Sequence, residues 1–294
     1  MSIVERALER LRADSPAART RRVFGKVVES QASQAPAGHV ISIDQEALRA
    51  VGLLAPKHQE REIAGQYRHI KRPLLAAAMG RGREPLPNGR FLMVASALAG
   101  EGKTFTAINL AFSMAIEKDL HVVLVDGDVA KPQISRMFGV DSERGLLDAV
   151  SDSSIDLERL ILPTDVPNLF LLPAGTRSDR ATELLASERM LAAMNSLLQR
   201  DDRRIFIFDS SPLLLSTEAL ALAEMAGQIV VVVRAEYTER HVLLEALDRL
   251  PEGCSAALLL NQSTQKSARY YYYGYGVAEG PAPEGRPAKS EIGE

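Results

Sequence analysis

Residues 91–111 read FLMVASALAGEGKTFTAINLA, and this stretch decides the fold. The short apolar run Phe91–Ala95 predicts a buried strand, and Thr104–Glu117 has the pattern of a helix. Between them, Ala97–Thr104 (ALAGEGKT) is a glycine-containing turn that ends in Lys-Thr, which is typical of a phosphate-binding P-loop when it joins a strand to a helix. We therefore expect a nucleotide-binding α/β fold.

The residue types in this loop suit the binding of phosphate and magnesium. Gly100 and Gly102 let backbone N–H groups approach phosphate oxygens. Lys103 neutralises the β- and γ-phosphates, Thr104 offers a hydroxyl to Mg²⁺, and the helix N-terminus adds partial positive charge. Ala97 stands where the general pattern has glycine. The loop predicts binding of a nucleotide together with magnesium.

From residue 90 onward, short apolar runs alternate with helical segments. The predicted strands are Phe91–Ala95, His121–Val125, Asn168–Leu172, Arg204–Phe208, Gln228–Val233 and Ser255–Leu260. The predicted helices are Thr104–Glu117, Thr182–Leu198, Thr217–Ala226 and Thr238–Leu250. Unbroken apolar strands are expected where helices cover both faces of a parallel sheet. We predict a three-layer P-loop NTPase sandwich with a mostly parallel, doubly wound sheet.

The chain divides into three expected regions: an N-terminal helical and linker region (1–89), a P-loop domain (90–265) and a flexible tyrosine-rich tail (266–294). Ser2–Arg12 has the spacing of a short amphipathic helix, which packs on protein or lies on a membrane surface. Both uses remain open at this stage.

Composition excludes several classes of protein. The chain has 294 residues, 46% of them hydrophobic, which is enough for a sizeable core. The net charge of −3 gives no global attraction to nucleic acid, so we expect no nucleic-acid partner. No apolar run reaches membrane-spanning length and the N-terminus does not read as a secretory signal. The single cysteine, Cys254, is expected as a buried thiol, which fits a reducing cytoplasm.

Carboxylates follow two of the predicted strands. Asp126 and Asp128 lie in VVLVDGDVAKP (Val122–Pro132), and Asp209 ends the strand of RRIFIFDSSP. In a doubly wound sheet these positions lie beside the P-loop, where acidic groups hold Mg²⁺ directly or through water. A solvated Asp-Gly-Asp turn is the alternative for the first pair.

The three segments in this order, followed by a terminal tyrosine cluster, closely resemble the bacterial tyrosine kinases (BY-kinases) of exopolysaccharide synthesis, most of all the tyrosine autokinases of exosortase-associated loci. The resemblance covers about Gln66–Tyr275. It implies Walker A, Walker A′ and Walker B motifs and an ATP:protein-tyrosine phosphotransferase that uses ATP and Mg²⁺. The sequence departs from the family pattern at Ala99, Ala130 and Gly65, where the family usually has proline, arginine and glutamate.

Carried over by position, the resemblance implies three sets of site residues. The expected nucleotide ligands are Ala99, Gly100, Glu101, Gly102, Lys103, Thr104 and Phe105. Asn261, at the end of the last strand, is expected to reach the adenine, as strand-end polar groups do in this class of fold. The expected metal-side residues are Thr104, Asp126 and Asp209, and the expected catalytic residues are Lys103, Asp126 and Asp128. The acceptor of the tyrosine proton is Asp126, or Asp128 with Asp126 at the metal.

Five tyrosines crowd the segment RYYYYGYG (Arg269–Gly276) just past the last predicted strand. The expected phosphoacceptors are Tyr270, Tyr271, Tyr272, Tyr273 and Tyr275. A flexible tail reaches a neighbouring molecule more easily than its own site, so we expect phosphorylation in trans. An aromatic patch packed on the domain or a weak aggregation motif is the alternative.

The resemblance also implies partners: an integral-membrane chain-length or co-polymerase activator, further copies of the chain in a homo-oligomer, and a cognate tyrosine phosphatase. The expected location is the cytoplasm, at the inner face of the membrane through the partner. Two other functions stay open, namely a switch ATPase of the MinD/ParA type and a catalytically poor nucleotide-binding regulator. The switch ATPases carry an additional lysine early in the P-loop, where this chain has Leu98.

Overall fold

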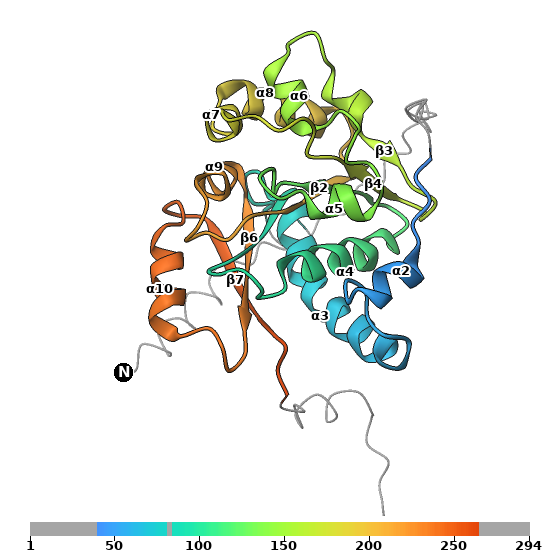
Figure 1. Ribbon diagram of the computed structural model, residues 1–294, viewed down its shortest axis with the longest axis vertical. Helices are drawn as coiled ribbons and strands as arrows, with labels where there is room; N and C mark the ends of the chain where they lie inside the picture. Colours follow the sequence, from blue (N-terminus) through green and yellow to red (C-terminus); the bar gives the residue numbers. More distant parts are fainter. Residues whose placement is uncertain (1–39, 81–83, 265–294) are drawn as a thin grey trace, which may run out of the picture. The chain divides into compact units, whose positions relative to one another are not determined.

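The computed structural model describes residues 40–80 and 84–264 (Figure 1). Contacts divide the chain into 1–35 and 36–294, and every described residue belongs to the second unit. The predicted Ser2–Arg12 helix and the tail tyrosines lie outside the described residues. The regional boundaries therefore stay predictions.

Within the described residues, seven strands form one sheet in the order β3-β4-β2-β5-β1-β6-β7. Neighbouring strands are parallel except for β3 and β4, which are antiparallel. The strands are β1 Phe91–Ser96, β2 His121–Asp126, β3 Leu162–Pro163, β4 Leu169–Leu172, β5 Arg204–Asp209, β6 Gln228–Arg234 and β7 Ser255–Asn261. The predicted mostly parallel, doubly wound sheet is confirmed, and its carboxyl edge is the place where ligands bind in such folds.

Helices cover both faces of the sheet (Figure 1). They are α2 Gln45–Ala50, α3 Glu60–Met79, α4 Lys103–Ala115, α5 Gln133–Met137, α6 Leu146–Ser151, α7 Ala181–Leu185, α8 Glu188–Arg200, α9 Thr217–Met225 and α10 Arg240–Asp248, with short 3₁₀ turns at Lys57–Gln59 and Leu157–Leu160. In β1, Phe91 and Met93 enter the core under α6 to α10, whereas Leu92 and Val94 enter the core under α2 to α5. This alternation explains why the strand reads as an unbroken apolar run.

Two predicted elements were wrong in detail. Thr182–Leu198 is two helices rather than one, because Ser187 caps α8 by accepting a hydrogen bond from the N–H of Met190 at 3.2 Å. The last strand is not buried on both faces: β7 lies at the edge of the sheet, and Leu258 and Leu260 are 57% and 63% exposed. Its composition does not distinguish an edge strand from a central one.

Cys254 is only partly buried, and the free thiol lies immediately before β7. The buried thiol expected from the sequence is therefore corrected to a half-buried one. Partial burial still raises the pKa of this thiol, which disfavours a reactive thiolate.

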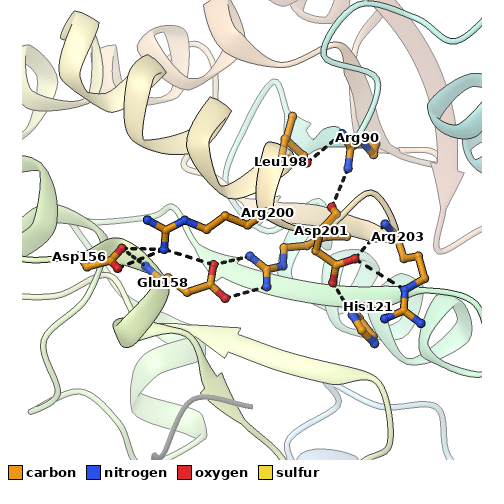
Figure 2. Close-up of polar contacts among 9 residues, drawn as sticks. Arg90, His121, Asp156, Glu158, Leu198, Arg200, Asp201 and Arg203 are labelled. Atoms are coloured by element: carbon orange, nitrogen blue, oxygen red, sulfur yellow. Dashed lines mark hydrogen bonds and ion pairs between the residues drawn. The ribbon is translucent and has the colours of Figure 1, made fainter. Parts of the chain in front are cut away.

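A network of charged side chains holds the amino edge of the sheet together (Figure 2). Arg204, the first residue of β5, forms a two-pronged contact with Glu158 at 2.6 and 2.7 Å. The Nδ1 of His121, at the start of β2, lies 2.5 Å from the carboxylate of Asp201, and Arg90 donates to the carbonyl of Asp201 at 2.9 Å. These contacts fix the strand ends farthest from the P-loop.

We predict that Arg204→Ala lowers the free energy of unfolding by about 1–3 kcal/mol, because it leaves the half-buried Glu158 carboxylate without its two-pronged partner. Denaturant unfolding measures the loss. Arg203→Ala is the matched control, since the Arg203 side chain is 53% exposed, and it should change stability by less than about 0.5 kcal/mol. Equal losses in both variants would contradict a special role for the Arg204 contact.

Candidate active site

The P-loop joins β1 to α4 through two glycines in left-handed conformations. Gly100 has φ of 80° and Gly102 has φ of 96°, a region in which other residues are strained. Gly102 also lies against Asn261, because a Cβ at this position would come within 2.1 Å of the Asn261 side-chain nitrogen. The positive φ favours glycine here, and a larger residue would also displace the Asn261 amide from the P-loop.

Glu101 is a buried P-loop residue whose carboxylate lies inside the protein. One oxygen accepts a hydrogen bond from the N–H of Leu98 at 2.7 Å, and the other accepts one from the hydroxyl of Thr238, in the segment after β6. The backbone carbonyl of Glu101 accepts a hydrogen bond from Asn261 at 2.9 Å. Glu101 thus ties the P-loop to the segment that follows β6 and to the last residue of β7.

Lys103 begins α4 and is 8% exposed. Burial lowers the pKa of its ammonium group, and the carboxylates of Asp209, Asp128 and Glu101 oppose this effect. A buried cation held among carboxylates at a glycine-rich loop is suited to receive phosphate charge.

Asp126 and Asp209 are direct neighbours across the pairing of β2 with β5. Both are buried, and one oxygen of each carboxylate, Oδ1, has no hydrogen-bond partner within the described part of the chain. Burial raises the pKa of Asp209 to about 7, with Thr104 and Asp126 having smaller, opposing effects. Burial likewise raises the pKa of Asp126 to about 6, although Ser135 donates to its Oδ2 through both N–H and hydroxyl at 2.7 Å.

These orphaned oxygens fit a magnesium ion. Thr104 donates its hydroxyl hydrogen to Asp209 Oδ2 at 2.7 Å, so the P-loop hydroxyl and this carboxylate already lie together. Among the described residues no group of three or more His, Cys, Asp or Glu side chains has the arrangement of a metal site. Magnesium fits without one, because it commonly takes one or two carboxylates and fills its remaining positions with phosphate oxygens and water.

Asp128 is only partly buried and lies two residues beyond the end of β2. Its Oδ1 accepts hydrogen bonds from the hydroxyl of Ser211 at 2.7 Å and from the N–H of Lys131 at 3.1 Å. Arg177 donates to the carbonyl of Ala130 at 2.8 Å, so a guanidinium lies against this loop. Asp128 is therefore the more accessible of the two carboxylates in the Asp-Gly-Asp segment.

The structure brings the predicted P-loop residues, Asp126, Asp128, Asp209 and Asn261 to one edge of the sheet. Their roles as ligands and catalysts stay predictions, and in this structure the Asn261 amide is bound to the P-loop. Sequence reasoning missed Ser135, Ser211 and Thr238, which orient the carboxylates. Ser211 lies inside the quoted RRIFIFDSSP segment, whereas no local pattern singles out Ser135 or Thr238.

A family model described as AAA domain matches residues 89–252, more than half of the chain. The chain belongs to the AAA domain family. It is also 28% identical over 227 residues to tyrosine-protein kinase YwqD of Bacillus subtilis, an alignment that covers 76% of this chain and 90% of that protein. The resemblance to bacterial tyrosine kinases is thereby supported, whereas the narrower likeness to exosortase-associated kinases stays a prediction.

Solved structures agree with the fold. The VpsO kinase domain is 25% identical, with a TM-score of 0.57, and the match covers 70% of this chain and 98% of that one. The chimerical protein CapA2B2 has a TM-score of 0.61 at 21% identity, with 78% and 96% covered, and this likeness shows the fold alone. The predicted P-loop sandwich is thus the fold of known kinase domains.

We predict that Asp209→Asn raises the melting temperature of the nucleotide-free protein by about 2–6 °C, because it removes a buried carboxylate whose pKa burial raises. The carboxyl pKa is higher in the folded than in the unfolded protein, so the wild type loses stability as pH rises toward about 7. The gain in the variant should grow from pH 5 to 7 and then level off.

Thermal melts at several pH values measure this difference, with and without Mg²⁺ and ATP. Asp119→Asn, at an exposed site, is the control and should leave the melt unchanged. The stabilisation by Mg²⁺ and ATP should be larger in the wild type than in Asp209→Asn. A variant that is less stable than the wild type at pH 7 would contradict the assigned cost of burying this carboxylate.

Thr238→Val should weaken ATP binding about 5–50-fold, because it removes the hydroxyl that donates to Glu101 and leaves a buried carboxylate oxygen unpaired. Thr238→Ser keeps the hydroxyl and should restore affinity to within about twofold of the wild type. Titration with a fluorescent ATP analogue measures both. If serine and valine bind alike, the Glu101 contact does not shape the P-loop.

Proposed function

We propose that this chain is an ATP-dependent protein-tyrosine kinase that phosphorylates its own C-terminal tyrosine cluster. The observation that carries the proposal is the meeting of Lys103, the two buried carboxylates with orphaned oxygens, and the more accessible Asp128 at one edge of the sheet. The kinase names of its relatives support the same reaction. The proposed ligands and catalysts are those predicted from the sequence.

In this mechanism Lys103 takes up charge on the transferred γ-phosphate, and the P-loop N–H groups orient it. Mg²⁺, held by Thr104, Asp209 and Asp126, would supply additional charge stabilisation when bound. Ser135 holds Asp126 inside the protein, so Asp128 is better placed to accept the proton of an incoming tyrosine hydroxyl. This geometry favours the second of the two assignments that the sequence left open.

The acceptor segment follows, a short way along the chain, a residue that contacts the P-loop. Asn261 ends β7 and contacts Glu101, and Tyr270 follows nine residues later. The proposed acceptors remain Tyr270 to Tyr273 and Tyr275, modified by a neighbouring molecule. Each phosphate adds about −1.5 to −2 charges at neutral pH. Successive transfers would therefore repel the tail from a site lined by carboxylates.

The proposal includes control of exopolysaccharide synthesis. It places the kinase in the cytoplasm, at the membrane through an integral-membrane activator, as a homo-oligomer whose phosphates a cognate phosphatase removes. These parts rest on the resemblance. Among residues 40–80 and 84–264, no helix is both long and apolar enough to cross a bilayer.

Intact-mass spectrometry after phosphatase treatment and incubation with Mg²⁺ and ATP tests the reaction. The wild type should gain several phosphates, and Lys103→Met should lower the rate at least about 100-fold, because the γ-phosphate loses its buried cation. Replacing the five tail tyrosines by phenylalanine should also abolish the gain. Lys57→Met, with a 71% exposed side chain, is the matched control.

The outcomes separate the parts of the proposal. Loss of phosphate with Lys103→Met but not with the phenylalanine tail would keep the kinase and overturn the acceptor sites. ATP hydrolysis without phosphate gain, even with the cytoplasmic part of the membrane activator present, would favour a switch ATPase. Mixing Lys103→Met protein with tail-less kinase tests transfer in trans, since the inactive chain should then gain phosphate.

A further inference from the structure

A large concavity lies between α3 and α4, on the face of the sheet opposite α6 to α10. It has a volume of about 1540 Å³ and is lined by α2, α3, the C-terminal half of α4 and residues 166–168. Its lining includes none of the P-loop residues 97–104 and none of the carboxylates Asp126, Asp128 and Asp209. We call it the α3–α4 groove.

Three arginines on one side of α3 line this groove. Arg61, Arg68 and Arg72 are separated by seven and four residues, so they lie in one stripe along the helix. All three are exposed, and none forms a hydrogen bond or ion pair with another described residue. Gly65 lies within the same stripe, and a Cβ there would be 3.9 Å from the guanidinium of Arg68. The stripe therefore presents three guanidinium groups that no residue in 40–80 or 84–264 pairs, beside an open position at Gly65.

The acidic side chains that line the groove are already paired. Glu60 forms an ion pair with Arg49 at 3.3 Å, and Glu117 forms one with the buried Lys71 at 2.7 Å. Lys118, exposed three residues beyond the end of α4, adds a further positive charge to the lining. The groove thus carries uncompensated positive charge, although the chain as a whole has a net charge of −3.

Apolar side chains lie beside this charge. Ile116 is 76% exposed and Phe112 is half-buried, and both line the groove together with the buried Leu54 and Leu75. A ligand that matches the whole surface needs an apolar ring or chain next to an anionic group. Phosphotyrosine has both, and arginine pairs with phosphate through two parallel hydrogen bonds.

We propose that the α3–α4 groove binds the C-terminal tyrosine segment after it has been phosphorylated. The inference rests on the proposed function, which supplies the phosphotyrosines. Residues 1–39 hold seven Lys or Arg against four Asp or Glu, so their net charge has the same sign as that of the groove. Residues 265–294 hold four of each, and five phosphates would add about −7.5 to −10 charges. The tail therefore complements the groove only in its phosphorylated form.

The spacing of the arginines suits such a ligand. Arg68 and Arg72 are four residues apart, which is about 6 Å along a helix. Alternate residues of an extended peptide, such as Tyr271 and Tyr273, are about 6.5–7 Å apart and point to the same side. Two neighbouring phosphotyrosines can therefore each meet one arginine. A tail bound here is kept away from the carboxylates of the active site.

Fluorescence anisotropy with a labelled synthetic peptide of residues 266–278, phosphorylated on Tyr271 and Tyr273, tests the proposal. The full-length chain is treated with phosphatase, freed of it, and kept without ATP, at about 0.15 M salt. The phosphopeptide should bind at least about 30-fold more tightly than the unmodified peptide or one with glutamate at both positions.

The double variant Arg68→Gln, Arg72→Gln should weaken phosphopeptide binding at least about 10-fold without a change in melting temperature, because both side chains are exposed. The double variant Arg159→Gln, Arg240→Gln removes the same charge from exposed sites elsewhere and should bind like the wild type. Equal weakening in both double variants would show charge attraction alone and overturn the proposal. If neither double variant changes binding, the peptide binds outside the α3–α4 groove, and the proposal is also overturned.

No binding of the phosphopeptide at tens of micromolar protein also overturns the proposal. The synthetic peptide needs no kinase activity, so failure of this test leaves the proposed reaction intact. Conversely, a chain that gains no phosphate from ATP can still bind the synthetic phosphopeptide. The proposed kinase reaction and the proposed binding groove can therefore fail separately.

Discussion

The pairing of β2 with β5 is the constraint on which the candidate site depends. It places Asp126 and Asp209 side by side at the carboxyl edge, deep enough that burial raises both carboxyl pKa values. Such an arrangement is unfavourable in the absence of a cation. Ser135 and Thr104 compensate one oxygen of each carboxylate, while the other oxygens stay unpartnered within the described structure. The site is thus organised around charge that a ligand supplies.

The amino edge of the sheet holds the charged contacts that stabilise the fold, whereas the carboxyl edge holds the candidate site. At the amino edge, carboxylates and guanidinium groups are matched, as in the contact of Glu158 with Arg204. At the carboxyl edge, glycines in left-handed conformations, a buried lysine and orphaned carboxylate oxygens lie together. Matched pairs fix the strand ends, whereas the unmatched groups keep their capacity to bind.

The fold and the centre of the site are predictable from the sequence because their signals are local. The P-loop joins a strand and a helix that are adjacent in sequence, and Asp126 and Asp209 each end an apolar run. The contact of Thr238 with Glu101 spans 137 residues and no local pattern marks it. The exposure of β7 depends on its position at the sheet edge, and composition carries no information about that position. The spacing of the arginines on α3 is visible in the sequence. The ion pairs of Glu60 with Arg49 and of Glu117 with Lys71, which leave those arginines without an acidic partner in the groove lining, are not.

The exposed edge strand has a consequence for handling this protein. On the side away from β6, β7 has no strand partner among the described residues, and its exposed side chains include Leu258 and Leu260. An apolar strand with free backbone donors and acceptors is a template for pairing with another chain. Pairing through this free edge would bring two molecules together without disturbing the contact of Asn261 with the P-loop. Heat inactivation would then depend on protein concentration, and diluting the sample would protect activity at a temperature where a concentrated sample precipitates.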